Sequence, residues 1–147
     1  MKGLLWRIDL LSRRAGAFRS IKMGDNSEIS GCHLPFVISI CRHPGMTQDQ
    51  LAKHLTFNKS TVARAIGSLE EQGFVKRQAD ERDRRSLLVY PTQKMLDILP
   101  RVLEITREWN EGLCEGISDE ELEIFASVLE KMKLRSLELL EGAEERK

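Results

Sequence analysis

The fold is decided by the stretch from Thr47 to Tyr90, which reads TQDQLAKHLTFNKSTVARAIGSLEEQGFVKRQADERDRRSLLVY. Thr47 is followed three residues later by Gln50, and this is the spacing of a capping box at the start of a helix. Asn58 is a favourable cap for a second helix, because its side-chain oxygen can accept from free backbone N–H groups. Gly73 can supply the left-handed residue that ends a helix. The pattern predicts two short helices joined by a tight turn.

The second predicted helix has one apolar face and one polar face. Val62, Ile66 and Leu69 recur at steps of four and three residues, which builds a buried stripe. At about 100° per residue, Ser60 and Arg64 fall on the opposite face. Ser, Thr and Arg can donate hydrogen bonds to phosphates and base edges, so this face suits a DNA major groove. An ordinary solvated helix face, which has a similar composition, is the alternative interpretation.

A cationic hairpin follows this helix. We expect Phe74 and Val75 to enter the core, and residues 86–90 to form the return strand. Basic and acidic side chains crowd the hairpin: Lys76, Arg77, Arg82, Arg84 and Arg85 against Asp80, Glu81 and Asp83. An arginine-rich tip suits a narrow, electronegative minor groove. The alternative is a surface loop whose three acids neutralise the arginines locally.

Two helices, a turn and a hairpin in this order predict a winged helix-turn-helix that binds DNA. The residues also resemble the MarR family of bacterial and archaeal transcription regulators. The matching runs are Met46 to Leu55, KSTVAR at 59–64, LEEQGFV at 69–75 and DERDRRS at 80–86. The last run is the most specific, since a generic helix-turn-helix does not require it. The resemblance covers Gly45 to Thr92 closely and the flanks only by pattern.

The resemblance implies a sequence-specific regulator of double-stranded DNA, a repressor that a small-molecule effector releases. By position, Ser60, Thr61 and Arg64 would face the major groove. Arg85 would enter the minor groove, with Asp83 holding its guanidinium. The full set of predicted DNA-binding residues is Lys59, Ser60, Thr61, Arg64, Ser68, Arg82, Asp83, Arg84 and Arg85.

Length and composition agree with one domain of residues 1–147. A chain of this length can bury roughly two-thirds of its unfolded surface. No apolar run approaches the roughly 20 residues of a membrane span, and Arg7 and Asp9 interrupt the apolar start, so we expect a cytoplasmic protein without a signal peptide. The net charge of zero conceals an asymmetry: residues 1–40 carry +3, residues 41–95 carry +4 and residues 96–147 carry −7. Such a distribution would steer the basic surface toward DNA.

Both chain ends carry predicted helices with apolar seams. The opening helix should end near Gly24, and its seam consists of Leu4, Ile8, Leu11, Ala15 and Phe18. A short core helix is predicted over Leu34 to Arg42. After the hairpin, a long helix starts at Thr92, and Pro100 should kink it. Its seam consists of Leu96, Leu99, Leu103, Thr106, Trp109 and Leu113.

Ser118 and Glu121 form a second capping box, and the helix that they open should run to about Leu140. We predict that the end helices, residues 1–25 and 92–141, pack against a second copy, while residues 30–91 form the DNA-binding lobe. The predicted fold class is therefore mainly α with a small β wing, a winged helix-turn-helix flanked by N- and C-terminal dimerisation helices. A homodimer matches a pseudo-palindromic operator with half-sites about 34 to 36 Å apart. The alternative is a monomer padded by these helices.

Family members commonly sense a small aromatic or phenolic molecule in a crevice between the dimer helices and the DNA-binding lobes. The ligand candidates that follow from this are Trp6, Arg14, Phe18 and Trp109, although aromatic residues at helical spacing are more often core.

A zinc or redox site is the alternative role for Cys32, His33, Cys41 and His43, which share one short segment. Their spacing lacks the regularity of structural zinc sites, so no metal or cofactor is predicted, and oxidant sensing by Cys32 or Cys41 stays open. The sequence has no G-x-S-x-G and no glycine loop that would bind phosphate, so an enzyme is not expected. A protein–protein interaction module is the remaining rival.

Overall fold

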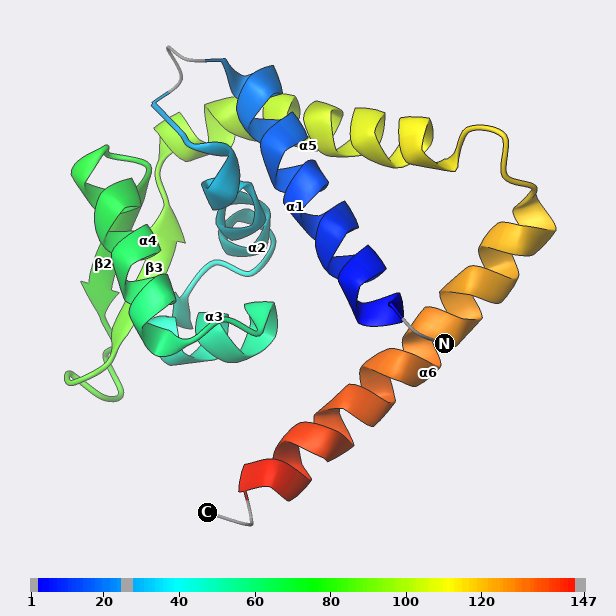
Figure 1. The fold of residues 1–147 in the computed structure, drawn as a ribbon. Helices are drawn as coiled ribbons and strands as arrows, with labels where there is room; N and C mark the ends of the chain where they lie inside the picture. The colour runs from blue at the N-terminus through cyan, green and yellow to red at the C-terminus, as the bar shows by residue number, and fades with distance from the viewer. Residues whose placement is uncertain (1–2, 25–27, 145–147) are drawn as a thin grey trace. The chain divides into compact units, whose positions relative to one another are not determined.

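The computed structural model describes residues 3–24 and 28–144 (Figure 1). Its helices are α1 (Leu4–Met23), a 3-10 turn η1 (Gly31–His33), α2 (Leu34–Arg42), α3 (Gln48–Leu55), α4 (Lys59–Glu71), α5 (Gln93–Cys114) and α6 (Asp119–Glu144). Its strands are β1 (Met46–Thr47), β2 (Val75–Ala79) and β3 (Leu87–Pro91). The predicted fold class, mainly α with a small β wing, is confirmed.

The chain divides into two compact units, one reaching to Trp109 and one beginning at Asn110. The first unit therefore contains α1, the helix pair, the sheet and most of α5. The second contains the end of α5 and α6. The predicted assignment of residues 1–25 and 92–141 to dimerisation stays a prediction, and its residues 1, 2 and 25 lie outside the described residues.

The helix pair has the predicted local chemistry. The Thr47 hydroxyl accepts from the backbone N–H of Gln50 at 3.1 Å, and the Gln50 side chain accepts from the Thr47 N–H at 2.8 Å. Thr56 adopts a left-handed conformation with φ of 55° and ends α3. Asn58 then caps α4 by accepting from the Thr61 N–H at 2.7 Å. These caps satisfy N–H groups that have no partner inside a helix, so each helix begins where the sequence predicts.

The hairpin strands β2 and β3 form a three-stranded antiparallel sheet with β1, in the order β1-β3-β2. Arg77 of β2 lies opposite Val89 of β3, and Met46 of β1 lies opposite Val89 on the other side. The sequence analysis missed β1, because a strand of two residues has no periodic pattern. Gly45 precedes it with φ of 84°, and a Cβ there would lie 2.9 Å from the hydroxyl of Tyr90. The predicted return strand begins one residue later than expected.

The core of the first unit joins α2, α3, α4, the sheet and one face of α5. The predicted inward residues Val62, Ile66 and Leu69 of α4 are fully buried. Phe74 and Val75 are at most 3% exposed. The face of α5 in this core consists of Met95, Val102 and Ile105, each with no exposed surface. The predicted seam of α5 is mostly a different face, since Leu96, Leu103 and Leu113 are 39–44% exposed, while Leu99 of the seam packs against the core.

The end helices match the prediction in type and differ in extent. α1 ends at Met23, next to Gly24, as predicted. α5 begins one residue after Thr92, and it continues through Pro100 to Cys114. The capping box of α6 is confirmed, because Glu121 accepts from the Ser118 N–H and Ser118 accepts from the Glu121 N–H. α6 continues four residues past the predicted end at Leu140, because the helix runs on through Gly142 to Glu144.

Candidate nucleic-acid interface

The outward face of α4 is polar and open. Ser60 and Arg64 are exposed, and Thr61 and Ser68 are partly exposed. The Ser60 hydroxyl donates to the side chain of Asn58 at 2.8 Å, so the cap also orients this hydroxyl. Lys59 pairs with Asp49 at 2.8 Å, but both side chains are more than 60% exposed, and such a pair is easily opened. None of the ion pairs among the described residues involves Arg64.

The acids of the wing loop, residues 80–86, bind its backbone. Asp80 accepts from the N–H of Arg82 at 2.9 Å. Asp83 accepts from the N–H of Arg85 at 3.1 Å and from the hydroxyl of Ser86 at 2.8 Å. Arg82, Arg84 and Arg85 are exposed and take part in no ion pair of the described part of the chain. The alternative of a loop neutralised by its own ion pairs is therefore not supported.

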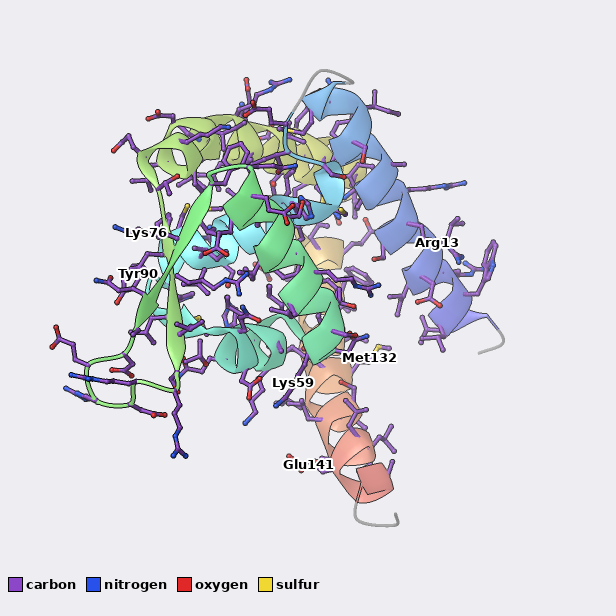
Figure 2. The ribbon with its side chains drawn as sticks, turned by 90° about the vertical axis from the view of Figure 1, so that its left-hand side faces the viewer. Arg13, Lys59, Lys76, Tyr90, Met132 and Glu141 are labelled. Carbon is purple, nitrogen blue, oxygen red and sulfur yellow. The ribbon has the colours of Figure 1, made fainter. Side chains whose placement is uncertain are left out.

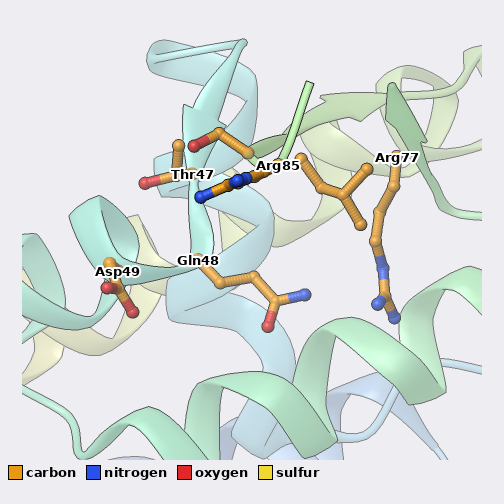
Figure 3. Close-up of a pocket in the computed structure, with 7 residues that line it drawn as sticks. Thr47, Gln48, Asp49, Arg77 and Arg85 are labelled. Atoms are coloured by element: carbon orange, nitrogen blue, oxygen red, sulfur yellow. The ribbon is translucent and has the colours of Figure 1, made fainter. Parts of the chain in front are cut away.

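The predicted contact between Asp83 and the Arg85 guanidinium needs correction. Both oxygens of the Asp83 carboxylate accept from other donors of the loop, so Asp83 fixes the backbone at Arg85 instead of its charged group. The guanidinium of Arg85 lies beside Thr47 (Figure 3). Entry of Arg85 into the minor groove stays a prediction.

The two cationic elements lie at the same end of the first unit. In Figures 1 and 2, the wing loop and the N-terminal end of α4, where Figure 2 labels Lys59, are at this end. The hairpin runs beside α4, and the wing loop projects past the sheet. A duplex approaching this end would meet the first turns of α4 and the wing loop together.

A polar cavity of about 390 Å³ lies between the start of α3 and the base of the hairpin (Figure 3). Gln48 and Asp49 line it from α3, and Arg77 and Arg85 line it from the hairpin. The guanidinium of Arg77 points toward α4, where it pairs with Glu70 at 3.0 Å. Sequence reasoning counted Arg77 only as one of the wing cations. The missed signal is strand alternation, which places Arg77 on the same side as the buried Val75.

The predicted ligand candidates do not form one site. Phe18 and Trp109 are in contact, with ring centroids 5.3 Å apart. Trp6 is 61% exposed and lies twelve residues before Phe18, which is about 18 Å along a helix. Arg14 is exposed on the same helix. Helical spacing alone cannot distinguish residues that meet from residues that merely share a helix.

A second cavity, of about 410 Å³, lies against α4. Phe36 and Phe57 stack in its wall at 5.5 Å, and Thr61 and Arg64 line it from α4. His33 lines it from η1, and its Nδ1 atom is buried without a hydrogen-bond partner in the described part of the chain. Burial lowers the pKa of His33, so its ring is held neutral at pH 7.

The cysteines and histidines do not converge on a metal site. Among residues 3–24 and 28–144, no group of three or more His, Cys, Asp or Glu side chains is arranged to hold a metal ion. Cys41 is half-buried, and burial raises the pKa of its thiol, which disfavours the reactive thiolate. Cys32 is exposed, and its thiol donates to the Ser30 hydroxyl at 3.3 Å.

None of the described helices is long and apolar enough to span a membrane.

Comparison with known proteins gives consistent matches to one family. The MarR family model matches residues 36–87. The crystal structure of a MarR transcriptional regulator from Methanosarcina mazei is 31% identical, has a TM-score of 0.85, and covers 95% of this chain and 99% of its own. The uncharacterised HTH-type transcriptional regulator YybA of Bacillus subtilis is 27% identical over 90% of this chain and 88% of its own.

The fold also matches that of a protein bound to DNA. A putative MarR family regulator from Listeria monocytogenes, whose structure was solved in complex with a 26mer DNA, has a TM-score of 0.85. It is 22% identical and covers 92% of this chain and 89% of its own.

Proposed function

Because the chain belongs to the MarR family and is thus a DNA-binding transcriptional regulator, we propose that it is a homodimeric repressor that a small-molecule effector releases from its operator. The observation that carries the proposal is the pair of cationic elements at one end of the first unit. The arginines of the wing loop and Arg64 of α4 have no ion-pair partner among the described residues, and their charge is available to phosphates.

In the proposed complex, α4 lies in the major groove and the wing loop enters the minor groove. Arg64 can bind a guanine through two hydrogen bonds, and Ser60, Thr61 and Ser68 can bind phosphates or base edges. Lys59 leaves its exposed partner Asp49 for a phosphate. Arg82, Arg84 and Arg85 bind the minor groove and its phosphates, and Asp83 keeps the loop in shape.

Exposed apolar surface supports the homodimer. In the second unit, α6 alone exposes 66% of Ile124, 55% of Phe125 and 45% of Val128. In the first unit, α1 exposes 72% of Leu5 and 61% of Trp6. Large apolar side chains repeated along whole helices indicate surfaces that another chain covers. A two-fold dimer would present two copies of α4 to successive turns of the major groove.

The apolar cavity against α4 is a stronger candidate for the effector site than the predicted set around Trp6. Its volume lies within the range of small-molecule sites, and its apolar walls hold a few convergent polar groups. Arg64 belongs to both this cavity and the proposed DNA interface. An acidic aromatic effector that pairs with Arg64 would withdraw it from DNA.

The DNA part of the proposal is tested by selecting bound fragments from random duplex DNA and footprinting the protein on the enriched sequence. We expect a pseudo-palindrome with two protected half-sites about 34 to 36 Å apart. Protection of a single half-site, together with a monomer by sedimentation, would contradict the dimeric regulator. Val128→Asp, which places a charge on the exposed face of α6, should yield monomers that bind the selected fragment more weakly.

The effector part is tested by screening aromatic acids for release of the selected fragment. An active acid should lose its effect when Phe57→Ala removes one wall of the cavity. If the acid still released the Phe57→Ala protein fully from the selected fragment, the effector site would lie elsewhere. In a transcription assay, the repressor proposal predicts that adding the protein lowers transcription from the selected operator and that the acid restores it.

A further inference from the structure

Arg77, like Lys76, is a cation of the hairpin that the proposed DNA interface does not use. Its side chain is 27% exposed, whereas the arginines of the wing loop are open to solvent. In β2, the exposed Lys76 and Gln78 face one side, and Val75 and Arg77 face the side of the core. Figure 2 shows Lys76 on the side of the hairpin away from α4. Arg77 therefore points at α4 instead of toward a duplex.

The guanidinium of Arg77 lies across one turn of α4. Its Nη2 atom is 3.0 Å from Oε2 of Glu70 and 3.9 Å from the position that a Cβ would take at Gly67. Gly67 and Glu70 are three residues apart and lie on the same face of the helix. The missing side chain at Gly67 leaves room for the guanidinium, and the Glu70 carboxylate fixes it in place. A Cβ at Gly67 would make an ordinary van der Waals contact with the Nη2 atom.

The rest of this environment restrains Arg77 further. Its Nε atom is buried and has no hydrogen-bond partner among the described residues, so the stem of the side chain is enclosed. Across the sheet, Arg77 of β2 pairs with Val89 of β3, which is 1% exposed and belongs to the core. The side chain thus connects a strand that is fixed in the core to the outward part of α4.

We propose that Arg77 is a positioning residue that braces β2 against Glu70 and Gly67 of α4, and so fixes the wing relative to the recognition helix. The brace rests on the proposed function, in which α4 and the wing read adjacent grooves. Base contacts need both elements in register, whereas contacts with phosphates tolerate small displacements. The brace therefore controls discrimination between the operator and other DNA more than it controls overall affinity.

The test uses Arg77→Met, which keeps an apolar stem and removes the guanidinium, together with Glu70→Gln and the double variant. Lys76→Met is the matched control, because it removes the same charge from the opposite side of the same strand. Affinity is measured for the selected operator and for random duplex over a series of salt concentrations. Arg77→Met and Glu70→Gln should each lower the operator-to-random ratio about tenfold, which corresponds to about 1.4 kcal/mol. The double variant should be no worse than the poorer single one.

The salt dependence separates a brace from a DNA contact. Under the proposal, Arg77→Met leaves the slope of log affinity against log salt unchanged, and the Lys76→Met protein keeps the operator-to-random ratio of the unmodified protein. If Arg77 binds a phosphate instead, the slope falls by about 0.9 and Glu70→Gln does not reproduce the loss of discrimination. Either of these results would overturn the proposal.

A second measurement tests the brace without DNA. The melting-temperature shifts of Arg77→Met, Glu70→Gln and the double variant should be non-additive, because both single changes break the same contact. Additive shifts overturn the brace even if the protein binds DNA as proposed. Non-additive shifts in a protein that shows no affinity for any duplex would keep the brace and refute the proposed function.

Discussion

Asp83 holds the wing loop in shape through two hydrogen bonds, one to the backbone at Arg85 and one to the hydroxyl of Ser86. A carboxylate that binds backbone N–H groups fixes a turn and leaves nearby cations free. Sequence alone gives the number of acids and bases in the loop, and the number alone suggests mutual neutralisation. Which donor each carboxylate meets depends on the path of the backbone.

His33 gives a prediction about pH at the same scale. Burial lowers its pKa in the folded protein, while the unfolded chain binds a proton near pH 6.5. The unfolded state therefore takes up more protons as the pH falls through 6.5, and folding stability decreases. Thermal unfolding should occur at lower temperature at pH 5.5 than at pH 7.5, and the difference should shrink in His33→Gln. An equal difference in the variant would show that His33 is not the cause.

At the scale of elements, the caps of α3 and α4 were predictable because they depend on residues three positions apart. Thr47 and Gln50 each accept from the other's backbone N–H, and the Asn58 side chain accepts from the backbone N–H of Thr61. The face of α5 was not predictable in this way. Its sequence carries two apolar stripes, and only the fold decides that Met95, Val102 and Ile105 enter the core of the first unit.

The capping box of α3 predicts a measurable loss. Thr47→Ala removes the hydroxyl that accepts from Gln50 and should lower the free energy of unfolding by about 1 kcal/mol. Thr47→Ser keeps an accepting hydroxyl and serves as the control. Urea unfolding of the three proteins checks the prediction. Equal stability of the alanine and serine variants would mean that the cap contributes little.

Because α5 has two apolar stripes, substitutions only two residues apart should lower the free energy of unfolding by very different amounts. Ile105 has no exposed surface, and Ile105→Ala should lower the free energy of unfolding by about 2 to 5 kcal/mol through the cavity that it leaves. Leu103 is 39% exposed, and Leu103→Ala should have a much smaller effect on unfolding of the monomer. Denaturant unfolding at low protein concentration compares the two. A larger loss for Leu103→Ala would contradict the assignment of the two faces.

At the scale of the whole molecule, charge is distributed along the chain in a way that the net charge of zero conceals. The first 95 residues carry a net charge of +7, and the last 52 carry a net charge of −7. The wing loop and α4 belong to the positive part, and in the proposed complex this cationic end of the first unit faces the DNA. The sequence predicted this asymmetry and the family. The contact between Arg77 and Glu70 was not predicted, because residues seven apart in different elements leave no local pattern.

The measurement that tests the central claim most directly is the salt dependence of binding to the selected operator. Fluorescence anisotropy gives the affinities of the unmodified protein, Arg64→Gln and Arg85→Gln at several salt concentrations. The account predicts a steep loss of affinity with salt for the unmodified protein. It predicts a slope smaller by about 0.9 in Arg85→Gln where a phosphate contact is lost, and reduced operator preference in Arg64→Gln. Unchanged affinity, slope and preference in both variants would contradict it.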